Sequence, residues 1–476
     1  MPQHQKRQVT VARRDQGARK KMTLITVCCV LVTLGILAVG AYFIWCLVDS
    51  KFFFCSQSLK FIPVTMVCDG KADCAGGKDE LTCVSSKPAN ATFPVRLVGE
   101  SMVLQVFRVE AGWSTVCADD WGLSDTRSAC QHLGYTLNPK SDRLDITSLH
   151  HSLGESFSAV RARTDGLLHT ALISRQTCIS GSVIALSCSD CGDAVGQDRV
   201  VGGSDTTIEE WPWQASLQKD KQHVCGGSLV SLTWLITAAH CFSRDGKDLN
   251  LWQVVLGRTH LMSTGGISVA AIMINKDYNS FTHDYDIAML KLTRPVTTGD
   301  TLRPVCLPPH SLPLKAGDSL VVTGWGFQQE EGNISSILQS ATVSLIDRKV
   351  CSRPSIYGPS LTPRMLCAGN MEGKVDACQG DSGGPLVFLS KSWQLVGVVS
   401  WGVGCARPGN PGVYCSVEQQ LNWIYSIMEV GVWPLSQTSL GLKRGRAGPD
   451  NVMGKLIPHF DAFLLVIDVF KMPYLI

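Results

Sequence analysis

The string Gly380-Asp381-Ser382-Gly383-Gly384-Pro385 decides the fold when it is read together with Thr237-Ala238-Ala239-His240-Cys241 and Asp286-Ile287-Ala288-Met289-Leu290. A serine hydroxyl is a poor nucleophile at neutral pH, so a neutral imidazole must take its proton and a buried carboxylate must orient that imidazole. Ser382, His240 and Asp286 supply these groups, in the order His, Asp, Ser along the chain. We therefore predict a catalytic triad, with the backbone N–H groups of Gly380 and Ser382 as an oxyanion hole.

The sequence around these strings predicts an all-β domain at 200–430. It consists of short strands separated by glycines, such as 252–257 and 319–324, with almost no helical periodicity before 417–428. This pattern fits a barrel or a sandwich, closed in either case by a C-terminal helix. With the three strings, residues 200–428 resemble the chymotrypsin-like (S1) serine peptidases. The resemblance implies two six-stranded β-barrels with the triad in the cleft between them.

The resemblance also implies a substrate pocket. Asp376 stands six residues before Ser382, where the trypsin-like branch keeps a carboxylate at the base of the pocket. This carboxylate implies cleavage after Arg or Lys, and Ala377 favours Arg because it removes a hydroxyl that would help to solvate a Lys ammonium. The implied substrate-binding residues are Asp376, Ser400, Trp401, Gly402 and Gly412.

An activation site precedes the domain, at the end of a linker at 190–199. Arg199-Val200-Val201-Gly202-Gly203 matches the family's cleavage site, where cutting after Arg199 frees the ammonium group of Val200. We expect this charge to pair with Asp381 and to order the oxyanion hole and the pocket. The uncut chain is then a zymogen, activated either by itself, because Arg199 suits the implied pocket, or by another protease.

Composition excludes several other classes of protein. The 476 residues are 45% hydrophobic and 17% charged, which is too apolar for a disordered chain, and the length suggests about three domains. The 43 basic and 40 acidic residues give a net charge of +3, which argues against nucleic acid as a partner. The 20 cysteines indicate an oxidising compartment.

An uncharged segment at 22–48 predicts a transmembrane signal anchor. At about 1.5 Å per residue it is long enough to cross a bilayer core of about 30 Å, whereas the apolar part of a cleaved signal peptide is about half as long. The basic residues of 1–21 keep that tail cytoplasmic. We therefore expect a single-pass type II protein of the cell membrane, whose extracellular part can also be shed. Sequons on that side predict glycosylation at Asn90 and Asn333.

A cysteine-rich, acidic stretch at 54–84 follows the anchor. Four carboxylates so close together need a cation, and a piece of about 30 residues needs disulfides or a metal to stay folded. The stretch resembles an LDL-receptor class A module, which implies structural calcium bound by Asp69, Asp73, Asp79 and Glu80 and by the carbonyls of Met66 and Lys71. It has four cysteines where that family has six, so a spacer without calcium is the alternative. Catalysis itself needs no cofactor.

Residues 94–189 predict short alternating strands around one helix at 125–133. The strings Gly112-Trp113-Ser114-Thr115-Val116-Cys117 and Ala129-Cys130-Gln131-His132-Leu133-Gly134-Tyr135 resemble a scavenger-receptor cysteine-rich domain, an α+β module. The resemblance implies that this domain binds a protein ligand or acts as a spacer, and no residue identifies a ligand.

The cysteines outside the anchor are odd in number. Cys28, Cys29 and Cys46 lie in the anchor, which leaves 17, so one thiol is left over or pairs between chains. The resemblances imply the pairs Cys55–Cys74, Cys68–Cys83, Cys117–Cys178, Cys130–Cys188, Cys191–Cys306, Cys225–Cys241, Cys351–Cys367 and Cys378–Cys405. Cys415 is then unpaired. It is either a buried, inert thiol or one that pairs between chains or distorts the pocket.

The order of anchor, calcium-type module, scavenger-type module and peptidase resembles the type II transmembrane serine proteases of the hepsin/TMPRSS subfamily. The resemblance implies a cell-surface, trypsin-like endopeptidase that acts on protein substrates. The alternatives are a catalytically silent, membrane-anchored binding scaffold and a structural adhesion molecule. The extension at 431–476 departs from the family. We expect it to be unstructured, to pack on the peptidase or to touch the membrane surface.

Overall fold

The computed structural model describes most of residues 92–430, with gaps at 109–110, 137, 161–167, 169–171, 196–203, 243–248, 328–331, 374–377 and 406. Before residue 92 it describes 52–55, 60–63, 73–74, 84–87 and eight helical positions within the predicted anchor. No helix formed by these described positions has both the length and the apolar character needed to cross a bilayer. The predicted extension at 431–476 lies outside the described residues.

Six antiparallel strands form the first barrel of the peptidase domain, because β15 and β16 at the two ends of the sheet also pair with each other. The strands are β12 (Gln214–Lys219), β13 (Gln222–Leu229), β14 (Trp234–Thr237), β15 (Trp252–Leu256), β16 (Ile267–Asn275) and β17 (Ala288–Leu292). A seventh strand, β3 (Val84–Lys87), comes from the segment after the stem and pairs with β16 in parallel.

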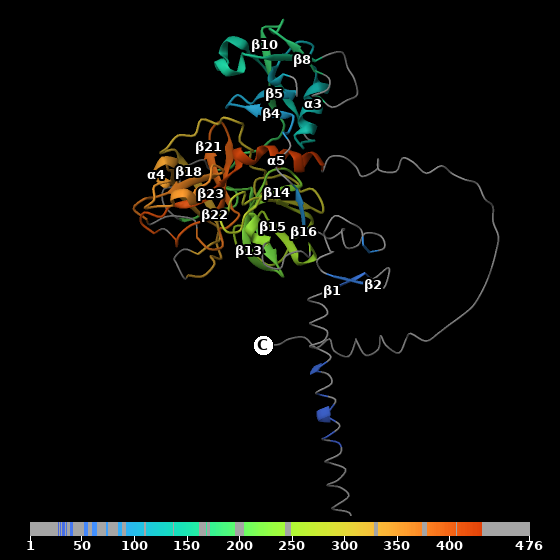
Figure 1. Ribbon diagram of the computed structural model, residues 1–476, viewed down its shortest axis with the longest axis vertical. Coiled ribbons are helices and arrows are strands. Elements are labelled where there is room, and N and C mark those ends of the chain that lie inside the picture. The colour runs from blue at the N-terminus through green and yellow to red at the C-terminus, as the bar shows by residue number, and fades with distance from the viewer. Residues whose placement is uncertain are drawn as a thin grey trace, which may run out of the picture. The chain divides into compact units, whose positions relative to one another are not determined.

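Six further strands form the second barrel, which the pairing of β19 with β20 closes. They are β18 (Ser319–Gly324), β19 (Gln339–Leu345), β20 (Met365–Gly369), β21 (Pro385–Leu389), β22 (Trp393–Trp401) and β23 (Gly412–Ser416). The short strand β11 (Ser204–Asp205) adds to β19. The expectation of two six-stranded barrels is therefore confirmed (Figure 1).

Helix α5 (Val417–Val430) ends two residues later than predicted and follows β23 directly. Its apolar residues recur at helical spacing and are buried: Leu421, Trp423, Ile424, Ile427 and Met428. Besides the anchor positions and the helix of the scavenger-type domain, the described residues form helix α4 (Arg348–Cys351) and the 3₁₀ turns η3 (Ile146–Ser148), η4 (His151–Leu153), η6 (Ala239–Phe242), η7 (Leu249–Leu251) and η8 (Gly358–Ser360).

The predicted scavenger-type domain is a sheet with one helix, α3 (Leu123–His132). The helix begins two residues earlier than expected because the Asp125 carboxylate accepts a hydrogen bond from the backbone N–H of Gly122 (2.8 Å), which satisfies one N–H at the helix start. The strands are β4 (Val95–Val98), β5 (Val103–Arg108), β6 (Gly112–Val116), β7 (Lys140–Asp145), β8 (Phe157–Val160), β9 (Leu172–Arg175) and β10 (Ser182–Ser187).

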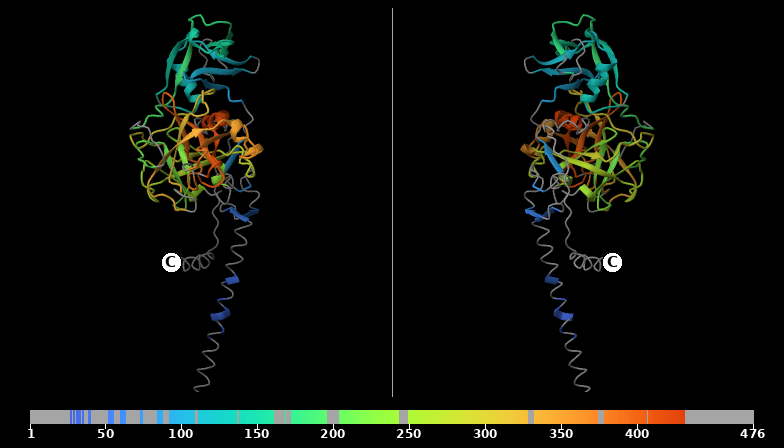
Figure 2. Two further views of the ribbon diagram at one scale, coloured as in Figure 1. Left: turned by 90° about the vertical axis from the view of Figure 1, so that its left-hand side faces the viewer. Right: turned by 90° about the vertical axis from the view of Figure 1, so that its right-hand side faces the viewer.

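Helix α5 also meets the scavenger-type domain, as Figures 1 and 2 show. The backbone N–H of Phe93 donates to the side-chain oxygen of Asn422 (2.6 Å), and the Phe93 ring lies 5.8 Å from that of Tyr425. Gly134 (φ +83°) packs on Met428, and a Cβ at residue 134 would lie 2.5 Å from the Met428 Cβ. The Cys191–Cys306 disulfide connects the linker to the peptidase domain.

The stem is the cysteine-rich stretch at 54–84 together with the residues that join it to the anchor. Its described part is a two-stranded hairpin, β1 (Phe52–Cys55) and β2 (Lys60–Pro63), followed by Asp73 and Cys74. Cys74 is buried and disulfide-bonded, and Asp73 is half-buried. The other predicted calcium ligands lie outside the described residues, as do Cys68 and Cys83: the side chains of Asp69, Asp79 and Glu80 and the carbonyls of Met66 and Lys71. Calcium binding by this module stays a prediction.

Candidate active site

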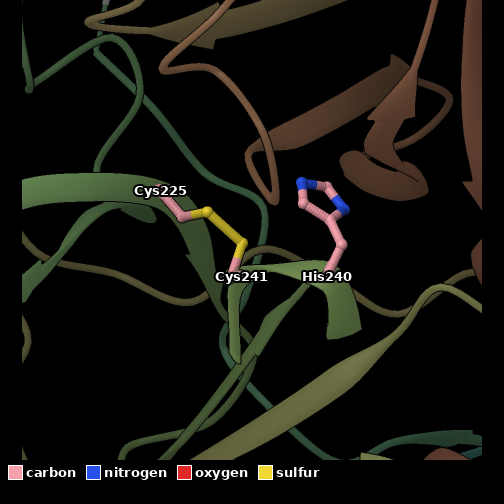
Figure 3. A group of neighbouring side chains, drawn as sticks. All are labelled: Cys225, His240 and Cys241. Carbon is pink, nitrogen blue, oxygen red and sulfur yellow. A yellow bond between two sulfur atoms is a disulfide. The ribbon is translucent and has the colours of Figure 1, made fainter. Parts of the chain in front are cut away.

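His240 lies on η6, the turn that follows β14 of the first barrel. The Cys225–Cys241 disulfide fixes this turn to β13, and Figure 3 shows the imidazole beside the bridge. The side chain is 22% exposed, so one edge of the ring reaches the cleft. The fold therefore presents this imidazole to solvent from a covalently constrained turn.

Asp286 is fully buried next to His240. Its carboxylate accepts three hydrogen bonds: from His240 Nδ1 (2.7 Å), from the His240 backbone N–H (2.9 Å) and from the Ser400 hydroxyl (2.6 Å). Burial by itself disfavours the imidazolium, but the Asp286 charge and hydrogen bond outweigh it and raise the pKa of His240. The pair can therefore hold a proton on His240, as a general base requires.

Ser382 approaches from the second barrel, in the turn before β21. Its carbonyl accepts from the Gly226 N–H (2.8 Å), and the N–H of the next residue, Gly383, donates to Val399 (2.8 Å). Only glycine fits at 383, because φ is +78° and a Cβ would lie 2.1 Å from the Thr237 hydroxyl oxygen. The turn is thus held against both barrels, with Ser382 partly exposed.

A pocket of about 170 Å³ opens beside Ser382. Four of the predicted substrate-binding residues, Ser400, Trp401, Gly402 and Gly412, line it with the Cys378–Cys405 disulfide. The fifth, Asp376, lies outside the described residues. Two larger hollows of about 330 and 660 Å³ are lined by residues of both the scavenger-type and peptidase domains, but neither has a histidine in its lining.

The Asp381 carboxylate is enclosed in the second barrel, although the residue keeps some exposed surface. It accepts hydrogen bonds from the N–H groups of Gly326 (2.8 Å) and Cys378 (3.0 Å), and burial raises its pKa to about 6. No side-chain cation pairs with it among the described residues. Its predicted partner, Val200, lies outside them, as does Arg199.

His283 is a site residue that the sequence analysis did not single out. It has φ +55°, its ring stacks on Trp401 (centroids 6.3 Å apart), and it meets the His240 ring edge-on (6.2 Å). The neighbouring Asp284 accepts hydrogen bonds from Arg364 and from the Thr362 hydroxyl of the second barrel. The one available signal was its position three residues before Asp286.

Six of the cysteine pairs that the resemblances imply are disulfides in the described part of the chain. The structure has the disulfides Cys117–Cys178, Cys130–Cys188, Cys191–Cys306, Cys225–Cys241, Cys351–Cys367 and Cys378–Cys405. Cys415 is free and buried, and burial raises the pKa of its thiol. This placement favours the inert thiol over one that pairs between chains. Of the two sequons, Asn333 is exposed and Asn90 lies outside the described residues.

Comparisons with known proteins agree with this fold and cleft, which define a trypsin-like serine endopeptidase. Residues 200–424 match the trypsin family, and residues 99–195 match the scavenger receptor cysteine-rich domain. The chain is 35% identical over 406 residues to Transmembrane protease serine 5 of Homo sapiens. The aligned region covers 84% of this chain and 88% of that protein. The chain therefore belongs to the transmembrane serine proteases of the trypsin family.

Proposed function

We propose that the protein is a type II, cell-surface protease that is made as a zymogen and cuts proteins after Arg or Lys. The observation that carries the proposal is the set of three hydrogen bonds on buried Asp286, which tie His240 to the strand that lines the pocket beside Ser382. The predicted anchor at 22–48 and the name of the human relative support the membrane location.

In the proposed mechanism, the Ser382 hydroxyl oxygen attacks the substrate carbonyl while Nε2 of His240 takes its proton. The oxyanion formed accepts from the N–H groups of Gly380 and Ser382. The tetrahedral intermediate then collapses, and His240 returns the proton to the leaving amine, which leaves an acyl group on Ser382. Water hydrolyses this ester by the same route, and Asp286 stabilises the imidazolium in both halves. These roles are those of the chymotrypsin class.

Selectivity for Arg or Lys is proposed to come from Asp376 at the base of the pocket. The glycines in its wall support this assignment, since a Cβ at Gly402 would meet its nearest neighbour only at 3.9 Å. A long side chain can therefore pass this wall and reach an opposite charge, and Ala377 leaves Arg as the favoured substrate residue.

Activation is proposed to occur by cleavage between Arg199 and Val200. The supporting observation is Asp381, an enclosed carboxylate whose two hydrogen bonds leave its charge without a cation among the described residues. Pairing with the Val200 ammonium supplies that cation. Since Asp381 adjoins Ser382 and Gly380, the ion pair would order the oxyanion hole at the same time.

The test is cleavage of matched reporter peptides. The ectodomain from residue 51 is cut after Arg199 and compared with its Ser382→Ala variant on peptides that contain Arg, Lys or Phe at the cleavage position. We expect cleavage of the Arg and Lys peptides to fall by about 10⁶-fold in the variant, the loss typical of such triads. A correctly cut, folded ectodomain that turns over none of the peptides would instead favour the binding scaffold.

A further inference from the structure

Three side chains with metal-binding atoms meet at the active-site cleft: His240, His283 and Asp286. One donor atom of each lies within 4.8 Å of the donor atoms of the other two. Imidazole nitrogen and carboxylate oxygen are the ligands, besides thiolate, that Zn²⁺ takes in proteins. The cluster therefore has the chemistry of a zinc site, in addition to that of the triad.

A second cluster, His240 with Cys225 and Cys241, has similar spacing but different chemistry. The two sulfurs are joined in a disulfide, as Figure 3 shows, so neither is a thiolate that can bind a metal. Of this cluster only His240 is left as a ligand. Any metal at His240 must find its other protein ligand on the side of His283.

Asp286 is placed to orient His240 toward a metal. The carboxylate already accepts from His240 Nδ1, from the His240 N–H and from Ser400, and it is fully buried. Direct coordination by Asp286 would break these bonds. As an acceptor for Nδ1–H, however, it keeps the lone pair on Nε2, the arrangement in which a carboxylate supports a zinc-bound histidine.

His283 is held where it can supply the second nitrogen. Its ring lies between Trp401 and His240, and the backbone beside it is tied to the second barrel through Asp284 and Arg364. Its Nδ1 is shielded from solvent and has no hydrogen-bond partner among the described residues. A nitrogen without a partner loses no hydrogen bond when it binds a metal.

We propose that Nε2 of His240 and a ring nitrogen of His283 bind one Zn²⁺ ion, and that this ion inhibits the protease reversibly. Two imidazole nitrogens on one tetrahedral Zn²⁺ lie about 3.3 Å apart. A ring nitrogen of His240 and one of His283 lie within 4.8 Å of each other, so the two rings need to approach for coordination. Water fills the remaining positions. Inhibition follows because the lone pair that takes the Ser382 proton is then committed to the metal.

The first test is inhibition of the full chain, purified in detergent and cut after Arg199. With an Arg reporter peptide, about 100 µM ZnCl₂ should lower the rate at least about tenfold, and a chelator should restore it. For His283→Asn and His283→Gln, the same zinc concentration should lower the cleavage rate less than about twofold relative to each variant's own zinc-free rate. The matched control is His260→Asn, since His260 is exposed and belongs to neither cluster. It should be inhibited like the parent.

The second test measures binding and does not depend on the proposed protease activity. The full-length Ser382→Ala chain is titrated with ZnCl₂ in a calorimeter. Chains that also carry His283→Asn or His283→Gln should bind one Zn²⁺ ion fewer per chain. His260→Asn in the same Ser382→Ala background should bind as many ions as Ser382→Ala alone. Equal zinc binding with and without His283 would overturn the proposal. Equal inhibition by zinc of the parent and the His283 variants would also overturn it. If the parent has no peptidase activity, the titration still decides the zinc site, and only the proposed function fails.

Discussion

Replacing Asp381 by Asn should remove a pH-dependent cost from the folding stability of the uncut chain, and it should destabilise the cut chain. In the uncut chain the carboxylate is enclosed, with two backbone N–H donors and no side-chain cation among the described residues. Burial raises its pKa from an ordinary 3.8 to about 6. Because one pKa unit corresponds to about 1.4 kcal/mol, ionised Asp381 costs about 3 kcal/mol of folding stability.

The sign follows from which state binds the proton more tightly. Folded Asp381 keeps its proton to higher pH than the unfolded chain does, so the cost is absent below about pH 3.8, grows as the pH rises and is complete above about pH 6. Asn carries no titrating charge, so the variant lacks this pH-dependent cost. Its single amide oxygen can accept from only one of the two N–H groups, which lowers stability by an amount that does not change with pH. The stability of Asp381→Asn relative to the parent should therefore increase by about 2 to 3 kcal/mol as the pH rises from about 4 to about 7.

Urea unfolding of the uncut ectodomain measures this gain, in a Ser382→Ala background that prevents self-cleavage. The difference between the two proteins removes the contribution of every other titrating group. After cleavage behind Arg199 the sign should reverse, since the Val200 ammonium then pairs with the carboxylate and Asn cannot replace that charge. If the free energy of unfolding depends on pH in the same way for the two uncut proteins, the reasoning is refuted. Burial would then not raise the pKa of the Asp381 carboxyl.

Three further changes have expected outcomes. Ser400→Ala removes the hydroxyl that donates to buried Asp286 (2.6 Å), so kcat/KM should fall about 10- to 100-fold and the folded state should lose about 1 to 3 kcal/mol; an unchanged kcat/KM would contradict this. Gly383→Ala places a Cβ 2.1 Å from the Thr237 hydroxyl oxygen at a φ of +78°, and urea unfolding should show a loss of about 1 to 3 kcal/mol or more. Cys415 should resist alkylation in the folded chain and react after unfolding, because it is buried; rapid labelling of the native protein would show an open thiol.

The sequence by itself determined the residue types and the class of chemistry. The three strings around His240, Asp286 and Ser382 indicate a peptidase because the reaction requires a nucleophile, a base and a buried acid, and the strings supply all three. Short strands separated by glycines predicted an all-β domain, and the family resemblance added the closure of two six-stranded barrels. Helix α5 was predicted to within two residues, since its apolar face repeats at helical spacing.

The tertiary structure alone decided which distant residues meet. Pairing of β3 with β16 joins the segment after the stem to the first barrel, and no local pattern at 84–87 specifies that partner. Likewise, Ser400 reaches Asp286 across 114 positions, and His283 lies against Trp401 from the other barrel. Local propensity and periodicity act over a few residues, whereas these contacts depend on how each barrel closes and how the two barrels pack.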